Sequence, residues 1–156
     1  MSRAKDIVER ASAAGVVIAT AESCTGGMIS AAITDIAGSS RVLDRGFVTY
    51  SNAAKMDMLG VSADTLGTYG AVSEQVAAEM AARALKQSNA TLSVSVTGIA
   101  GPGGSDFKPE GRVCFGIATE QGVETHQIDF GALGRVGVRS ATVAHALELL
   151  LQKLPN

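Results

Sequence analysis

The stretch VVIATAESCTGGMISAAITDIAG, residues 16–38, decides the fold. It opens with a short apolar run rich in β-branched residues, 16–20, which is typical of a buried strand. After the loop AESCTGG, residues 21–27, apolar side chains recur at helical spacing until Gly38, namely Ile29, Ala32, Ile33 and Ile36. A strand followed by a tight loop and an amphipathic helix is a building unit of α/β sheets, so the stretch predicts one such unit.

Helices and strands continue to alternate on both sides of this unit. An amphipathic helix precedes it and stops at Gly15. Downstream, residues 46–50 predict a second strand, and residues 51–60 predict a short helix closed by a glycine. Ser73 is the expected N-cap of an Ala-rich helix that runs to about Lys86.

The next part of the chain predicts a strand and a hairpin. Apolar residues alternate over 92–96 and again over 113–117. A Gln-Gly turn at 121–122 follows, and residues 123–130 have mixed polarity. We therefore expect the last two strands to be antiparallel, with 123–130 at an edge of the sheet.

Leucines at helical spacing predict a final helix that begins near Arg135 and ends before Pro155. A length of 156 residues fits one domain with a sizeable core. Helices alternating with strands, followed by a hairpin, predict an α/β fold. We expect residues 1–156 to form a single domain, a three-layer α/β/α sandwich around a mixed sheet.

Charge and composition exclude several classes of function. The 13 Lys and Arg residues against 15 Asp and Glu give a net charge of −2, which disfavours binding to nucleic acid or to anionic lipid. No stretch approaches the roughly 18 apolar residues that a membrane-spanning helix needs. Cys24 and Cys114 are too few for a disulfide scaffold and lack zinc-site spacing. We expect a cytoplasmic protein with no nucleic-acid and no membrane partner.

The loop AESCTGG carries residue types that suit chemistry on an anion or a carbonyl. Ser23 and Thr25 lie on a strand-to-helix passage, and Gly26 and Gly27 allow main-chain N–H groups to converge there. Such a turn suits a phosphate cradle, or an oxyanion hole beside a serine nucleophile. It equally suits a helix cap with no chemistry. Cys24 is a second candidate nucleophile, or a small buried residue.

A serine nucleophile needs a base, and the sequence offers few candidates. His126 falls in the polar hairpin strand and His145 in the final helix, so neither suits a serine triad. Lys55 follows the strand at 46–50, near the expected meeting point of the loops, and burial lowers the pKa of a lysine. Tyr50 ends the same strand. From the residues alone, Lys55 is also compatible with a solvated helix lysine and Tyr50 with an ordinary aromatic.

Five motifs resemble the CinA C-terminal family, the nicotinamide-nucleotide amidohydrolases. They are AESCTGG, RGFVTYSNAAK, GAVSE, TGIAGPGG and KPEGRV, and the resemblance extends over residues 16–150. It implies hydrolysis of the carboxamide of nicotinamide mononucleotide to nicotinate mononucleotide and ammonia, within bacterial pyridine-nucleotide salvage. It implies no cofactor and no metal.

The resemblance also implies roles for particular residues. Ser23 matches the nucleophile, Lys55 the base that takes and returns its proton, and Tyr50 a group that relays or orients that proton. Main-chain N–H groups around Thr25, Gly26 and Gly27 would stabilise the oxyanion. The resemblance favours Ser23 over Cys24.

We expect the substrate phosphate to bind the glycine-rich loop through Thr97, Gly98 and Gly101. Arg45 and Arg139 match arginines of the family pattern and are further candidates. The longer family members carry an additional N-terminal domain, whose activities are not carried over to this sequence. Two alternatives remain: a non-catalytic nucleotide-binding module, and an interaction partner related to competence or DNA damage. We also expect a homo-oligomer.

Overall fold

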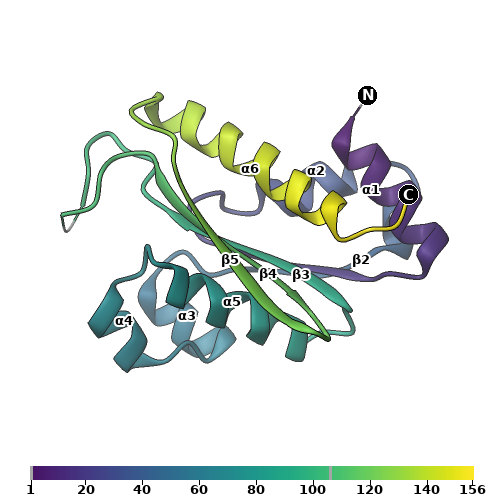
Figure 1. The fold of residues 1–156 in the computed structure, drawn as a ribbon, viewed down its shortest axis with the longest axis horizontal. Helices are drawn as coiled ribbons and strands as arrows, with labels where there is room; N and C mark the ends of the chain where they lie inside the picture. Colours follow the sequence, from purple (N-terminus) through teal and green to yellow (C-terminus); the bar gives the residue numbers. More distant parts are fainter. Residues whose placement is uncertain (1, 106) are drawn as a thin grey trace.

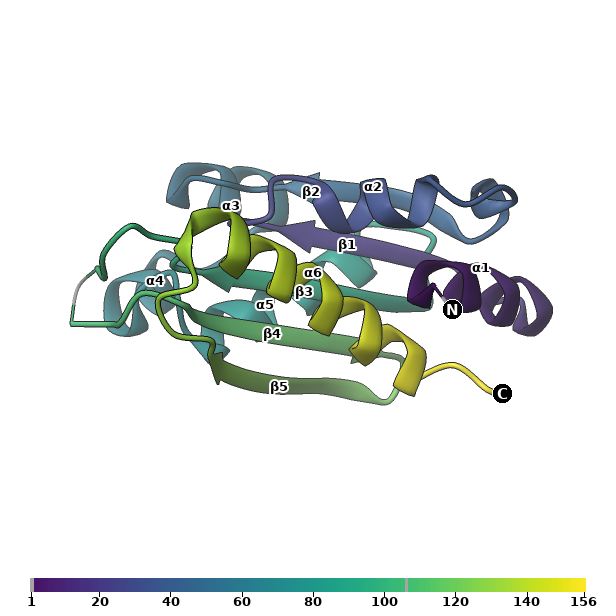
Figure 2. The same cartoon turned by 90° about the horizontal axis from the view of Figure 1, so that it is seen from above.

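The computed structural model describes residues 2–105 and 107–156, which form a five-stranded sheet in the order β2-β1-β3-β4-β5 (Figures 1 and 2). The three strands on one side are parallel, and the hairpin on the other side is antiparallel. The strands are β1 (Ile18–Glu22), β2 (Leu43–Val48), β3 (Leu92–Gly98), β4 (Arg112–Thr119) and β5 (Gly122–Asp129). The expected mixed sheet with an antiparallel edge hairpin is confirmed.

Helices cover both faces of the sheet (Figure 1). One face carries α1 (Arg3–Ala14), α2 (Met28–Thr34) and α6 (Gly134–Gln152). The other carries α3 (Asn52–Leu59), α4 (Ala63–Tyr69) and α5 (Glu74–Lys86). A 3₁₀ turn, η1 (Ser39–Arg41), leads into β2. The three-layer α/β/α sandwich is therefore confirmed.

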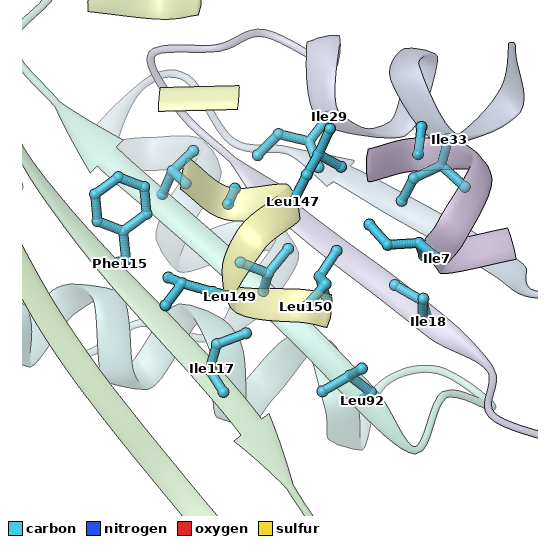
Figure 3. Close-up of a cluster of buried hydrophobic side chains, with 14 of the residues drawn as sticks. Ile7, Ile18, Ile29, Ile33, Leu92, Phe115, Ile117, Leu147, Leu149 and Leu150 are labelled. Atoms are coloured by element: carbon cyan, nitrogen blue, oxygen red, sulfur yellow. The ribbon is translucent and has the colours of Figure 1, made fainter. Parts of the chain in front are cut away.

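The larger apolar core lies between the sheet and the α1, α2 and α6 layer (Figure 3). Ile7, Ile18, Ile29 and Leu150 are fully buried there, each contributing about 1.5–3 kcal/mol by leaving water. On the other face, α5 approaches the sheet so closely that a Cβ at Gly116 would lie 2.5 Å from a helix carbonyl. The alanines of α5 permit this close packing.

Several boundaries differ from those expected. The first strand begins and ends two residues later than 16–20, because pairing with β3 extends it to Glu22. The second covers Leu43–Val48 and not 46–50, because it pairs with β1 along that length. The sequence did not predict α4. Leu66 is the buried residue of that short helix, so no periodic apolar stripe marks it.

The order of the strands determines where a ligand can bind. The chain passes from β1 to β2 on one side and then to β3 on the other side of β1. The connections therefore diverge between β1 and β3, and in α/β sheets such a divergence leaves a crevice at the carboxyl ends of the strands. In the described part of the chain, no helix combines the length and the apolar character that crossing a membrane requires.

Candidate active site

A serine and a lysine meet at the carboxyl end of β1. Ser23 directly follows β1, and Lys55 lies in the middle of α3. The Nζ atom of Lys55 donates a hydrogen bond to Ser23 Oγ at 2.9 Å. It also donates to the carbonyl oxygens of Thr49 at 2.9 Å and Tyr50 at 3.2 Å. The amine is thus held against the hydroxyl by main-chain acceptors.

Burial determines the protonation of Lys55. The residue is 1% exposed, and among the described residues no carboxylate forms a salt bridge with it. Loss of solvation disfavours the ammonium form and lowers the pKa of Lys55 from 10.5 to about 8. A lysine with this pKa supplies a neutral amine near neutral pH, as a general base requires.

Cys24 lies next to Ser23 but in a different environment. It is buried, and burial raises the pKa of its thiol to about 11. Its sulfur packs against Gly98, where an added Cβ would lie 3.2 Å from it. The thiol therefore stays protonated at neutral pH, which disfavours Cys24 as the nucleophile.

The serine and lysine open into a pocket of about 190 Å³. Its walls come from the ends of β1 and β3, from the start of α3 and α6, and from the segment before α5. The lining residues are Ser23, Cys24, Tyr50, Asn52, Lys55, Ala71, Val72, Thr97, Gly98, Ala100 and Arg135. A larger groove of about 700 Å³ lies between α1, α2 and α6, but Ser23 and Lys55 are not among its lining residues.

Arg135 and Tyr50 form the mouth of this pocket. Arg135 NH2 donates to the phenol oxygen of Tyr50 at 2.7 Å, and NH1 donates to the carbonyl oxygen of Gly101 at 2.7 Å. Tyr50 is 58% exposed. Its carbonyl oxygen, by contrast, faces Lys55 and Ser23 and accepts from Ser23 Oγ at 3.3 Å. The phenol and the carbonyl of Tyr50 thus contact different parts of the site.

The two arginines named from the sequence lie elsewhere. Arg45 Nε contacts Asp44 at 2.8 Å and NH1 contacts the carbonyl of Gln87 at 3.1 Å, at the end of α5. It does not line the pocket. Arg139 donates to the carbonyl oxygens of Cys24 at 3.1 Å and Thr25 at 3.4 Å. It therefore holds the main chain of the turn and does not line the pocket. The structure therefore does not place either guanidinium among the lining residues.

The turn residues are largely occupied with their own structure. Thr25 is fully buried and its hydroxyl donates to the carboxylate of Glu22 at 2.5 Å, which directs it away from the pocket. The amide of Gly26 donates to the carbonyl of Ser23 at 3.1 Å. Gly26 and Gly27 have φ values of 59° and 107°, which glycine adopts readily. Of the roles that the sequence left open for this turn, a phosphate cradle does not fit, because the Glu22 carboxylate already accepts from the amides of Ile29 and Ser30 at the start of α2.

The glycine-rich loop forms another wall. Thr97 lines the pocket, but its hydroxyl donates to the carbonyl of Ala71 at 2.8 Å. Gly98 lines the pocket, and an added Cβ would lie 2.7 Å from Val113. Gly101 has a φ of 91° and presents its carbonyl to Arg135. These residues shape the pocket and hold Arg135.

Three residues of the site were not singled out from the sequence: Arg135, Glu22 and Lys108. Lys108 Nζ donates to the carbonyls of Tyr69 and Val72, both at 2.6 Å, and so holds the wall before α5. Its motif, KPEGRV, was the available signal. The signal for Glu22 was a charged residue directly after a buried apolar run.

Neither histidine takes part in the pocket. His145 packs edge-on against Phe115 with ring centroids 4.7 Å apart, and burial lowers its pKa. His126 pairs with Phe115 across the hairpin. Among the described residues, no group of three or more His, Cys, Asp or Glu side chains is arranged to hold a metal ion.

Comparison with known proteins gives consistent matches over almost the whole chain. The family model for the CinA C-terminal domain matches residues 1–154. Nicotinamide-nucleotide amidohydrolase PncC of Escherichia coli (strain K12) is 47% identical over 98% of this chain and 93% of its own length. The PncC protein of Enterobacter agglomerans is 54% identical over 90% of this chain and 87% of its own. The crystal structure of competence/damage inducible protein CihA from Agrobacterium tumefaciens has a TM-score of 0.93 at 51% identity, covering 96% of this chain and 92% of that one.

Proposed function

Because the chain belongs to the CinA C-terminal domain family, we propose that it is an amidase that hydrolyses the carboxamide of nicotinamide mononucleotide. The products would be nicotinate mononucleotide and ammonia, within pyridine-nucleotide salvage. The names of the amidohydrolase relatives support the substrate. The observation that carries the proposal is the 2.9 Å hydrogen bond between Lys55 Nζ and Ser23 Oγ.

The proposed reaction has two halves. In the first, Ser23 Oγ attacks the carboxamide carbon while Lys55 Nζ takes the hydroxyl proton. Main-chain amides of the turn after Ser23, other than that of Gly26, which donates to the Ser23 carbonyl, would donate to the tetrahedral oxyanion. Lys55 then returns the proton to the departing ammonia, which leaves an ester on Ser23. In the second half, Lys55 takes a proton from a water molecule whose oxygen attacks the ester carbon. Lys55 then gives this proton to Ser23 Oγ as the ester C–O bond breaks, and the acid product leaves and ionises to the carboxylate.

The role of Tyr50 in this proposal is divided between its two oxygens. The carbonyl oxygen orients Lys55 Nζ and Ser23 Oγ, both of which donate to it. The phenol contacts Arg135. We therefore assign the orientation of the proton-transfer pair to the main chain of Tyr50, and to its phenol the support of Arg135.

The size of the pocket suggests how a mononucleotide would lie. Ligand pockets commonly measure roughly 300–1,000 Å³, whereas this one measures about 190 Å³. The pyridine carboxamide would fill it, with the ribose phosphate at the mouth. Arg135 forms no ion pair in the described part of the chain and lines that mouth, so we assign the phosphate to its guanidinium.

The test is release of ammonia by the purified chain supplied with nicotinamide mononucleotide, together with chromatographic detection of nicotinate mononucleotide. Turnover by the wild type and its loss in Ser23→Ala would support the proposal. Binding of the mononucleotide without any release of ammonia would instead identify a non-catalytic nucleotide-binding module.

A further inference from the structure

A buried carboxylate lies beside the nucleophile and takes no part in the proposed reaction. Glu22 is the last residue of β1 and is 0% exposed. Its Oε1 accepts from Thr25 Oγ1 at 2.5 Å and from Ile29 N at 2.8 Å. Its Oε2 accepts from Ser30 N at 3.0 Å and Ser30 Oγ at 3.2 Å. Burying a carboxylate is costly unless donors surround it, and here they do.

Glu22 caps α2 from the neighbouring strand. The N-cap residue of α2 is Gly27, which has no side chain to accept a hydrogen bond. Ile29 and Ser30 occupy the second and third helical positions, whose amides an N-cap side chain normally satisfies. Both amides donate to Glu22. A carboxylate is also favoured near the positive end of the helix dipole.

The same contacts close the turn that carries the nucleophile. Ser23 and Cys24 lie between Glu22 and Thr25, which are joined by the 2.5 Å hydrogen bond. The Ser23 amide donates to the carbonyl of Val96 at 3.1 Å, and the Ser23 carbonyl accepts from Gly26 at 3.1 Å. The main chain of Ser23 is thus fixed on both sides, with its hydroxyl 2.9 Å from Lys55 Nζ.

We propose that Glu22 is a positioning residue for the nucleophile. Its carboxylate joins the end of β1, the turn and the start of α2, and so keeps Ser23 Oγ within hydrogen-bonding distance of Lys55. Glu22 acts through the main chain and does not contact the substrate. This inference rests on the proposed function. Displacing a reacting group by about 1 Å costs on the order of 100-fold in rate, so loosening the turn should lower kcat by about 10- to 100-fold.

The test compares two fully buried threonines. Thr25→Val removes the hydroxyl that donates to Glu22 and keeps the shape of the side chain. Thr142→Val makes the same change in α6, where the hydroxyl donates to the carbonyl of Val138 at 2.7 Å, away from the pocket. Thr25→Ser keeps the hydroxyl. Glu22→Gln is the harsher variant, because either orientation of its amide NH2 faces a main-chain donor.

The expected result is a selective loss in kcat. Thr25→Val should lower kcat by about 10-fold or more with KM changed less than about threefold, and Thr25→Ser should restore most of it. Thr142→Val should keep wild-type kcat even where it lowers the melting temperature. Glu22→Gln should lower kcat further. If it does not fold, Thr25→Val alone decides the matter.

Labelling of Ser23 by a small sulfonyl fluoride, followed by intact mass, separates this inference from the proposed function. Ser23 Oγ displaces fluoride from sulfur while Lys55 takes the proton, so the labelling rate reports on the pair without the natural substrate. Slower labelling of Thr25→Val than of Thr142→Val supports positioning, even if the wild type releases no ammonia. Equal kcat and equal labelling rates in the two variants would overturn it. A displaced pH profile in Thr25→Val would also overturn it, because Glu22 would then act on the proton.

Discussion

Lys55 Nζ lies 2.9 Å from Ser23 Oγ and is surrounded by main-chain carbonyls with no ion pair to a carboxylate in the described residues. A carboxylate partner would stabilise the ammonium form and raise the pKa of the lysine. Carbonyl acceptors orient the amine without adding a full negative charge. The arrangement therefore combines a fixed position with a lowered pKa, and both are requirements of a general base.

Ser23→Ala should abolish deamidation and leave the fold intact. The change removes one hydroxyl from a turn held by other contacts, so kcat should fall by at least about 10⁴-fold and the free energy of unfolding should change by less than about 1 kcal/mol. Cys24→Ala is the adjacent control and should keep most of the activity. Steady-state ammonia release checks both variants. An inactive Cys24→Ala beside an active Ser23→Ala would reassign the nucleophile.

The activity should rise with pH through the pKa of Lys55. Burial lowers that pKa to about 8, and the base works only as the neutral amine. We expect kcat/KM to increase from about pH 6 and to level off above about pH 9. Lys55→Arg should be inactive across this range, because a guanidinium stays protonated. Turnover by Lys55→Arg would mean that the residue supplies charge and not a base.

The free energy of unfolding should also depend on pH because of the lowered pKa of Lys55. Between pH 8 and 10.5 Lys55 is neutral in the folded chain and protonated in the unfolded chain. The unfolded state binds more protons in that window, so the contribution of Lys55 to the free energy of unfolding rises with pH. Urea unfolding of the wild type and of Lys55→Met at several pH values measures it.

The difference between those two proteins should increase in favour of the wild type from pH 8 to 10.5. Cys24 and Cys114 titrate in an overlapping range, since burial raises the pKa of each to about 11. Both are present in the two proteins, so their contribution largely cancels in the difference. A difference that does not vary with pH would contradict a lowered pKa for Lys55.

Arg135→Gln should weaken binding of the substrate phosphate without impairing the reaction at the carboxamide. We expect kcat/KM for nicotinamide mononucleotide to fall by about 10- to 100-fold, because a charge-assisted contact to phosphate is lost. Nicotinamide riboside, which lacks the phosphate, should be little affected. Arg45→Gln is a matched control, since Arg45 contacts Asp44 and the end of α5. Equal losses on both substrates would place the phosphate elsewhere.

The sequence predicted those parts of the site that depend on local order. The strand-loop-helix unit places Ser23 at the carboxyl end of β1, and the helix closed by Gly60 carries Lys55, so local patterns located both residues. The family resemblance, and not the local pattern, selected them over a helix cap and a solvated lysine, and their catalytic roles stay predictions. The arginines show the limit of such reasoning. Arg45 was a candidate and points to Gln87, whereas Arg135 meets Tyr50 from 85 residues away along the chain. A long flexible side chain takes its direction from tertiary partners, and motif spacing does not report them.

In the fold, too, local sequence patterns predicted some features and tertiary contacts determined the others. Periodic apolar side chains predicted α1, α2 and α6, and the Ser73 N-cap with the Ala-rich run after it predicted α5. The order β2-β1-β3 depends on which strands pair across long connections, and the exact ends of β1 and β2 depend on that pairing. Tertiary pairing therefore decided what local propensity could not.

Gly101→Ala should reproduce the loss of kcat/KM that we expect for Arg135→Gln. An added Cβ would lie 2.6 Å from the carboxylate of Glu110, and the φ of 91° disfavours any other residue. Either the Glu110 carboxylate, which accepts a hydrogen bond from Gly103 N, or the loop itself must shift, and a shift of the loop moves the carbonyl that holds Arg135. Gly103→Ala tests backbone strain without the contact, because its φ of 82° is equally unfavourable while no atom of residues 2–105 and 107–156 lies within 4 Å of the added Cβ. We expect Gly101→Ala to lower kcat/KM for the mononucleotide by about 10-fold or more and Gly103→Ala to change it far less.

Since Gly101 acts through Arg135, the double variant with Arg135→Gln should lose little more than either single variant. Additive losses would show that the loop contacts the substrate by a separate route.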